Sequence, residues 1–188
     1  MKERKHRNKP PVTGEDRNSD GYDILDATCG NRSMWYDGQK ERSDTIYFDM
    51  RDELPGFTGQ EGRTYSVEPD HMGDYRDLPY DNQSFKLVVF DPPHLTGNGM
   101  DDLSGRIRLS YGELDKETWK EDLTAGFMEL WRVLEVGGTL VFKFADNDIY
   151  FSELFDCFPV DPLFGTTFKQ RSGVETRYFT FFKSEACL

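Results

Sequence analysis

A short run near the middle of the chain, Lys86-Leu87-Val88-Val89-Phe90-Asp91-Pro92-Pro93-His94, carries most of the information about fold and function. Its first half is apolar and rich in β-branched and aromatic side chains, which is typical of a buried strand. The two prolines lack N–H donors, so the sheet ladder cannot continue past Asp91 and a rigid turn follows.

The turn follows the carboxyl end of the predicted strand, which is a position where ligands often bind. In open α/β sheets, ligands bind beyond the carboxyl ends of the strands. The Asp91 carboxylate and the backbone carbonyls that the prolines hold in place are all hydrogen-bond acceptors, which suits them to hold an amino group. Taken alone, the run is equally consistent with a solvated acid in an ordinary proline-rich loop.

The flanking sequence predicts further strands that end in polar or acidic residues. A buried strand over Tyr22–Ala27 leads into Thr28-Cys29-Gly30, and a second strand over Thr45–Phe48 ends at Asp49. We expect residues 51–70 to be mostly loop, with a third strand at Tyr65–Val67 that leads toward Asp74. A strand over Thr139–Ala145 follows later and is apolar apart from Lys143.

Helical periodicity is clearest over Glu117–Leu134, where large apolar residues recur at three- and four-residue spacing. We expect Gly137-Gly138 to stop this helix. A shorter helix is expected over Ile149–Phe158, and a helix-like stretch around Met34–Tyr36. Residues 95–115 include Gly97, Gly99 and Gly105 and have mixed charge, which predicts a long loop that covers a binding site.

The last part of the chain alternates like a hairpin over Thr166–Gln170 and Arg177–Lys183. Strands that alternate with crossovers and then close with a hairpin predict an α/β fold. We expect one Rossmann-like doubly wound sheet over residues 21–188, mostly parallel, with a C-terminal antiparallel hairpin strand. Residues 1–20 are polar and are expected to be a flexible arm, either plainly disordered or touching nucleic acid.

Composition limits the class of protein and its partners. The 188 residues are 36% hydrophobic and 31% charged, with a formal net charge of −12. Residues 1–20 carry +2 and the remainder −14, which counts against tight, unaided binding of duplex DNA. The chain has no apolar run long enough to span a membrane and no secretory signal at its N-terminus. Three scattered cysteines and three dispersed histidines predict a reducing, cytoplasmic location and no metal site.

The ordered set of strand ends resembles a known family. An acid–glycine turn, an acid after the second strand and Asp91-Pro92-Pro93 after a later strand resemble class I methyltransferases that use S-adenosylmethionine. More closely, the chain resembles the amino-methyltransferases of nucleic acid bases, whose signature is Asp-Pro-Pro-aromatic. Within that group it is similar to short phage and prophage enzymes, over about residues 22–183. The segment from Glu129 to Gly138 strengthens the resemblance.

The resemblance implies a cofactor site for S-adenosylmethionine. The turn at Asp26, Thr28, Cys29 and Gly30 would approach the methionine part of the cofactor, since glycine allows close backbone approach. Asp49 would accept both ribose hydroxyls.

For two more residues near the cofactor, Asp74 and Arg32, the sequence leaves alternatives open. Asp74 would bind the adenine amino group and Tyr75 would pack on the ring, although Asp70 and Asp77 compete for the role of Asp74. Arg32 would pair either with the cofactor carboxylate or with Asp26 or Asp37.

The resemblance also implies a catalytic group. Asp91 and the carbonyl of Pro92 would hold the target amine, within the turn that Pro93 makes rigid, and direct its lone pair at the methyl group. His94 stands where relatives carry an aromatic residue, so it would stack on the base or accept a proton. Lys143 would either reach this edge or extend to solvent.

The first functional hypothesis is that the protein transfers a methyl group to N6 of adenine in DNA or RNA. A base inside a duplex must first be flipped out, and we expect no recognition domain in a chain of this length. The substrate would therefore be single-stranded, or presented by a partner, or recognised over a short sequence. The alternatives are a methyltransferase of a small molecule or protein, and a non-catalytic subunit that binds S-adenosylmethionine. The sequence does not indicate the oligomeric state.

Overall fold

The computed structural model describes residues 21–59, 65–99, 106–169 and 173–187. The arm expected at 1–20 and the tip of the C-terminal hairpin lie outside these residues. Strands occupy Ile24–Asp26 (β1), Thr45–Asp49 (β2), His71–Met72 (β3), Phe85–Phe90 (β4), Thr96–Gly97 (β5), Leu114–Asp115 (β6), Leu134–Asp146 (β7), Phe164–Lys169 (β8) and Glu175–Phe182 (β9). Helices occupy Arg106–Tyr111 (α1), Trp119–Val133 (α2) and Phe151–Leu154 (α3), with 3₁₀ turns at Phe155–Cys157 (η2) and Glu185–Cys187 (η3).

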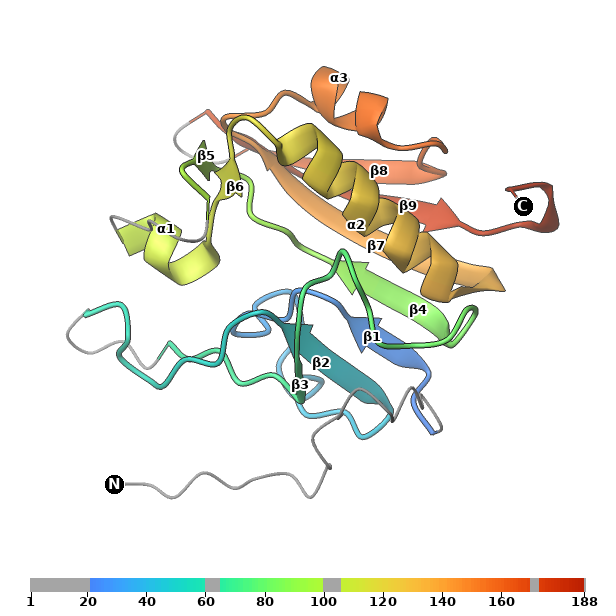
Figure 1. Ribbon diagram of the computed structural model, residues 1–188, viewed down its shortest axis with the longest axis horizontal. Coiled ribbons are helices and arrows are strands. Elements are labelled where there is room, and N and C mark those ends of the chain that lie inside the picture. Colours follow the sequence, from blue (N-terminus) through green and yellow to red (C-terminus); the bar gives the residue numbers. More distant parts are fainter. Residues whose placement is uncertain (1–20, 60–64, 100–105, 170–172, 188) are drawn as a thin grey trace.

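Seven of the described strands form one sheet in the order β3-β2-β1-β4-β7-β9-β8 (Figure 1). β1 pairs in parallel with both β2 and β4, and β4 pairs in parallel with β7. β9 runs antiparallel between β7 and β8. The predicted α/β fold, a mostly parallel sheet with an antiparallel hairpin, is therefore confirmed. From β1 the chain adds β2 and β3 on one side and then β4 and β7 on the other, so the strand order reverses between β1 and β4. This switch point is where such sheets bind ligands.

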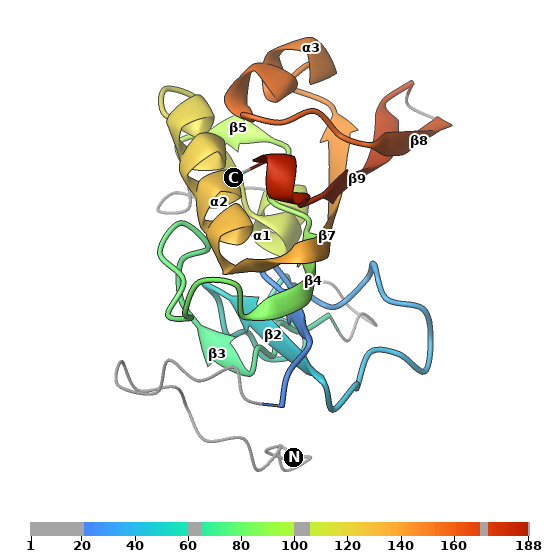
Figure 2. The ribbon, with the colours of Figure 1, turned by 90° about the vertical axis from the view of Figure 1, so that its right-hand side faces the viewer.

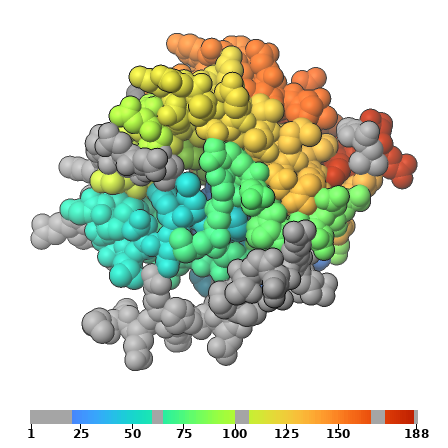
Figure 3. All heavy atoms as spheres, in the orientation of Figure 1, coloured from blue at the N-terminus to red at the C-terminus, as the bar shows by residue number. Residues whose placement is uncertain are grey.

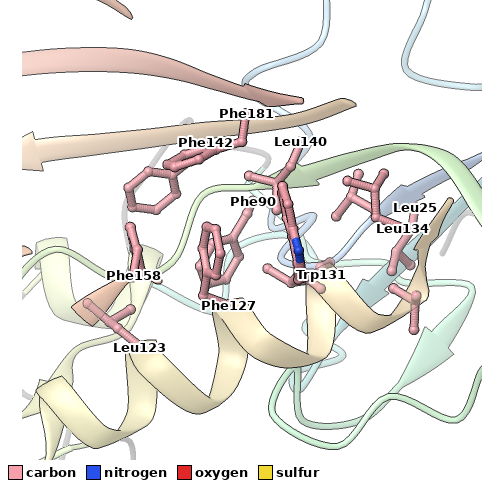
Figure 4. Packing of buried hydrophobic residues seen from close by; sticks show 14 of the residues in the cluster. Leu25, Phe90, Leu123, Phe127, Trp131, Leu134, Leu140, Phe142, Phe158 and Phe181 are labelled. Carbon is pink, nitrogen blue, oxygen red and sulfur yellow. The ribbon is translucent and has the colours of Figure 1, made fainter. Parts of the chain in front are cut away.

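One face of the sheet is covered by α2, α3 and η2 (Figures 1 and 2). The apolar stripe of α2 is buried, as its three- and four-residue spacing predicted. Phe127 is fully buried and stacks on Phe158 at a centroid distance of 4.4 Å, while its ring edge meets Phe181. Figure 4 shows these aromatic rings filling the space between the helix and the strands. This packing holds β4 and β7, which carry Asp91 and Lys143, against a fixed support.

The segment between β1 and β2 forms turns, so the expected helix-like stretch at Met34–Tyr36 is wrong. Gly30, Arg32 and Gly38 all have positive φ, which a right-handed helix cannot accommodate. Trp35 is instead drawn toward the sheet, where its ring meets Tyr47 edge-on at 5.4 Å. The turns thus occupy the sheet face opposite α2 (Figure 2).

Two other predicted elements are displaced. The third strand is His71–Met72 rather than Tyr65–Val67, because Val67 makes only an isolated antiparallel bridge to Glu53. The helix α2 ends at Val133, where Leu134 turns to extended backbone, and not at Gly137-Gly138. These glycines lie inside β7, where the pairing with β4 shifts register between Phe85 and Leu87. Gly137 has a φ of 85°, so the pair forms an irregularity in the strand instead of a helix stop.

The segment 95–115 is more ordered than the predicted loop. Its described residues form β5, α1 and β6, with β5 and β6 paired in parallel. Arg108 forms an ion pair with buried Glu113 and donates to the carbonyl of Thr96 at 3.0 Å. The residues 100–105 lie outside the described part. Among the described residues, no helix is long and apolar enough to cross a membrane.

The packing of α2 predicts a large loss of stability on truncation of Phe127. Phe127→Ala removes a fully buried ring that contacts Phe158, Phe181 and Trp131. We expect the free energy of unfolding to fall by about 3–5 kcal/mol, measured by chemical denaturation. Met128→Ala on the exposed side of the same helix is the matched control and should change it by less than about 0.5 kcal/mol. A loss below about 1 kcal/mol for Phe127→Ala would contradict this packing.

Candidate active site

A cavity of about 800 Å³ opens at the carboxyl ends of β1, β2, β4 and β7. The four residues predicted to hold the target amine all line it: Asp91, Pro92, Pro93 and His94. Six of the residues predicted to bind the cofactor line it as well: Thr28, Cys29, Gly30, Asp49, Asp74 and Tyr75. The fold therefore gathers these ten predicted residues, which span 66 positions from Thr28 to His94, around one cavity.

Asp91 is held by groups from two neighbouring strands. Its backbone N–H donates to Thr28 Oγ1 at 2.8 Å, which joins the turn after β4 to the turn after β1. Its carboxylate accepts from Lys143 Nζ on β7, with Nζ 2.5 Å from Oδ2. Both side chains are about one-fifth exposed, at 20% for Asp91 and 23% for Lys143. Of the two positions that the sequence left open for Lys143, the structure shows the one at the active-site edge.

Asp49 supports the first turn of the cavity. Its Oδ2 accepts the Gly30 N–H at 2.9 Å, and its Oδ1 accepts the Arg51 N–H at 3.0 Å. Gly30 has a φ of 48° and open space where a side chain would begin. A glycine there keeps the floor of the cavity clear and lets the turn adopt its left-handed backbone. Oδ1 also accepts from Arg51 Nε at 3.4 Å, so Oδ2 is the oxygen that keeps a lone pair beyond the one already used.

Asp26 lies behind the cavity, and the described cavity wall does not include it. It is 2% exposed and accepts a hydrogen bond from the Trp35 indole, with Nε1 2.6 Å from Oδ2. Burial raises the pKa of Asp26 to about 7, although the Trp35 hydrogen bond acts in the opposite direction. The nearby carboxylates of Asp91 and Asp49 add to the increase. Asp26 thus contacts the turn after β1 through Trp35 and, unlike the other residues predicted to bind the cofactor, does not line the cavity.

Asp74 and Tyr75 reach the cavity from the segment after β3. Both carboxylate oxygens of Asp74 accept from the Arg76 guanidinium, at 2.9 and 3.0 Å from Nε. Burial alone would raise the pKa of Asp74, but the hydrogen bonds from Arg76 outweigh it and the net shift is downward. Tyr75 packs edge-on against Phe90 at 5.1 Å and close to Gly126 of α2. A larger residue at Gly126 would collide with the Tyr75 ring.

His94 lies beside Asp91 at the cavity wall, where its ring meets Phe144 edge-on at a centroid distance of 6.3 Å. Burial lowers the pKa of His94, and nearby Lys143 lowers it further, against the opposing effect of Asp91. The ring is therefore neutral near pH 7, with one nitrogen able to accept a proton.

Two residues of the turn after β1, Arg32 and Cys29, are surrounded by other parts of the protein. Arg32 pairs with neither Asp26 nor Asp37: it donates to the carbonyls of Lys40 and Glu68, and its guanidinium lies 3.8 Å from the centroid of the Tyr47 ring. Arg32 thus connects the turns between β1 and β2 to the β2 strand and to the segment before β3. Burial raises the pKa of the Cys29 thiol, so Cys29 is a neutral wall residue and not a nucleophile.

The segment of β5, α1 and β6 forms one wall of the cavity. Arg51 Nη1 donates to the carbonyls of Leu109 and Ser110 at 3.3 and 3.2 Å, and Tyr65 meets Tyr111 edge-on at 5.9 Å. The space-filling view shows the α1 region and the segment after β2 at the same end of the molecule (Figure 3). The covering role expected for residues 95–115 therefore agrees with where their described part lies.

Several wall residues had no clear signal in the sequence. Arg51 follows Asp49 by two positions and reads as part of a charged surface run. Val174 and Thr176 line the cavity because β9 is antiparallel, so that its beginning meets the end of β7. Only the strand order shows that this end belongs to the site. The described residues hold no cluster of three or more possible metal ligands.

Comparison with protein-family profiles and with curated proteins finds no match for the sequence. Solved structures do match. TrmN from Thermus thermophilus superposes with a TM-score of 0.53 at 14% identity, over 87% of this chain and 44% of TrmN. A TehB-like SAM-dependent methyltransferase from Corynebacterium glutamicum gives 0.50 at 18% identity, over 92% of this chain and 89% of that protein. The [4+2]-cyclase SpnF gives 0.52 at 11% identity, over 87% of this chain and 75% of SpnF.

At these identities the likeness concerns the fold. The chain has the Rossmann-like fold of SAM-dependent methyltransferases, and it spans less than half the length of TrmN. The presence of a cyclase among the similar structures illustrates that one fold supports different reactions, so that chemistry has to be argued from the residues of the site.

The pKa of Asp26 predicts how stability depends on pH. The folded protein holds the Asp26 proton up to about pH 7, whereas an ordinary aspartate loses it near 3.8. Folding therefore takes up a proton between these values, and this residue lowers stability progressively as the pH rises through that window. We expect Asp26→Asn to gain stability relative to wild type by up to about 1.4 kcal/mol per pH unit from pH 4 to 7.

The measurement is urea denaturation at several pH values. Asp37→Asn, whose side chain is 94% exposed in the same segment, is the control and should show a flat difference. A flat difference for Asp26→Asn as well would show that its carboxyl is ionised throughout this range.

Proposed function

We propose that the protein is a methyltransferase that uses S-adenosylmethionine and transfers a methyl group to an exocyclic amino group, N6 of adenine in DNA or RNA. One observation carries the proposal. The Asp91-Pro92-Pro93-His94 turn ends β4 and lines the same cavity as Gly30 and Asp49, at the switch point of the sheet. The resemblance of the sequence to phage and prophage amino-methyltransferases rests on the same elements in the same order.

The cavity suits S-adenosylmethionine in size and polarity. A volume of about 800 Å³ lies within the range of small-molecule sites. Gly30 would leave room for the methionine part, Asp49 Oδ2 would accept one ribose hydroxyl with its remaining lone pair, and Oδ1 would accept the other in place of its long contact with Arg51 Nε. Asp74 would bind the adenine ring only by sharing its oxygens with Arg76. The shared fold with SAM-dependent methyltransferases supports this assignment.

The chain's own residues would position the amine and receive its proton. When bound, S-adenosylmethionine supplies an electrophilic methyl group on a sulfonium, whose carbon–sulfur electron pair stays on sulfur as the new nitrogen–carbon bond forms from the amine lone pair. Asp91 and the Pro92 carbonyl would accept the two amine hydrogens and so orient that lone pair. The proton released from the methylated nitrogen would pass to the Asp91 carboxylate or to the neutral His94 ring. Positioning supplies most of the acceleration in such a transfer.

The acidic surface bears on the form of the substrate. A net charge of −12 gives little general attraction to a phosphate backbone. A base in single-stranded nucleic acid, or one that a partner has already extruded, would reach the cavity without the energy needed to open a duplex. The same charge favours a second candidate, a small or protein-borne amine, which would need no phosphate contact.

The deciding experiment is incubation of the protein with methyl-labelled S-adenosylmethionine and, separately, DNA, RNA and a cell lysate. We expect label in N6-methyladenine after digestion of a nucleic acid. Label in protein or small molecules alone would support the second candidate and refute the first. Cofactor binding without any transfer would favour a non-catalytic subunit.

Two substitutions should separate the two halves of the site. Asp91→Ala is expected to lower methyl transfer at least about 100-fold while changing cofactor affinity only a few-fold, because Asp91 faces the amine. Asp49→Ala is expected to weaken cofactor binding at least about tenfold, measured by calorimetry. Loss of cofactor binding in Asp91→Ala would show that Asp91 belongs to the cofactor half of the site, and the proposed role of Asp91 would be wrong.

A further inference from the structure

Asp91 and Lys143 occupy neighbouring positions on adjacent strands. The parallel register pairs Phe90 of β4 with Phe142 of β7, so the next residue of each strand lies beside the other. Lys143 also pairs with Tyr178 of β9, which places it inside the sheet and not at a free edge. The position of its ammonium group next to the Asp91 carboxylate is thus set by the sheet and not by a flexible surface chain.

The pair leaves unused hydrogen-bonding capacity toward the cavity. A lysine ammonium has three N–H donors, and the described contacts of Lys143 use one of them, to Asp91 Oδ2. The other oxygen of Asp91, Oδ1, accepts from no donor within the described residues. Both side chains line the cavity. The cavity wall therefore presents an acceptor and a charged donor side by side.

We infer that this pair recognises an amino group together with the ring nitrogen next to it, so that Lys143 is a specificity residue for adenine. Asp91 accepts a hydrogen bond from the amino group, and Lys143 donates to N1 of the ring. The inference rests on the proposed function and adds to it which edge of the target base the protein recognises. Enzymes that modify bases read the extruded base by hydrogen bonds to its Watson–Crick edge.

The arrangement of donors and acceptors excludes the Watson–Crick edges of two other bases. Uracil and thymine have no amino group to place against Asp91. In guanine, the ring position beside the amino group on that edge carries an N–H, which would oppose the Lys143 donor. Cytosine has the same amino–nitrogen arrangement as adenine, so selection between these two falls to the shape of the cavity and to His94.

A simpler role for Lys143 would be that of a counterion. The negative charges of Asp91 and Asp49 help to raise the pKa of Asp26, and a cation beside Asp91 would offset part of the negative charge in this region. A counterion stabilises Asp91 whatever the substrate, whereas a donor to N1 stabilises only substrates that have N1. The two roles therefore differ in how the effect of removing Lys143 depends on the substrate.

The test combines one substitution with one atom change in the substrate. Single-stranded oligonucleotides carry one target base, adenine, 1-deazaadenine or 3-deazaadenine, between randomised flanks that lack adenine. The proteins are wild type, Lys143→Met and Lys143→Ala. Lys86→Met is the matched control, since Lys86 lies on β4 in an exposed ion pair with Asp23. The readouts are kcat/KM for methyl transfer and, with S-adenosylhomocysteine present, the equilibrium affinity for each oligonucleotide.

For wild type and Lys86→Met, we expect 1-deazaadenine to lose about 10- to 100-fold relative to adenine, the size expected for a hydrogen bond from a charged donor. The loss for 3-deazaadenine should be clearly smaller. Lys143→Met and Lys143→Ala should lose a similar factor on adenine and show little further loss on 1-deazaadenine. Affinities should follow the same pattern.

An unchanged penalty for 1-deazaadenine in both Lys143 variants would overturn the inference and leave a counterion role. Equal losses for the two deaza bases with wild type would overturn it without any variant, so a variant that fails to fold does not prevent the decision. Absence of transfer from wild type to ordinary adenine would instead refute the proposed function, and with it the inference that depends on it.

Discussion

The parallel register of β1, β4 and β7 is the constraint on which the site depends. Asp26 pairs with Val89 and Phe90 with Phe142, so the residues that follow each strand emerge at one edge of the sheet. The hydrogen bond from Asp91 N–H to Thr28 and the contact of Lys143 with Asp91 join three strands across that edge. A one-residue slip of β7 would turn Lys143 to the opposite face and bury its charge against α2.

The core stabilises this register from one side only. The aromatic packing of Phe127, Phe142, Phe158 and Phe181 fills the space under α2 and α3. The opposite face is covered near β1 and β2 by turns, which Trp35 and Arg32 attach to the sheet. Helical packing thus supplies rigidity beneath the reactive turn, while the shorter, polar segments shape the cavity wall.

How much of this was predictable varies with the kind of signal. The strand before Asp91, the α2 stripe and the C-terminal hairpin were predictable, because hydrophobic periodicity is a local property and burial selects for it. The helix-like stretch at 34–36 and the stop at Gly137-Gly138 were not, because positive φ at Arg32 and the extended backbone at Leu134 follow from tertiary contacts. Of the site residues, those directly after strands were found, whereas Arg51, Val174 and Thr176 were not, since they enter the cavity from a charged run and from an antiparallel strand.

The sequence by itself determined the fold class and the acceptor-rich turn, because apolar runs and prolines act on their own segments of chain. Only the tertiary structure decided which charges meet. Lys143 is an isolated polar residue in an apolar strand until the pairing of Phe90 with Phe142 places it against Asp91. Asp26 looks like a ligand-binding acid in the sequence, whereas the fold buries it at 2% exposure and gives its carboxyl to the Trp35 indole. Contacts between strands that are distant in sequence depend on strand order and register, and no local pattern specifies either.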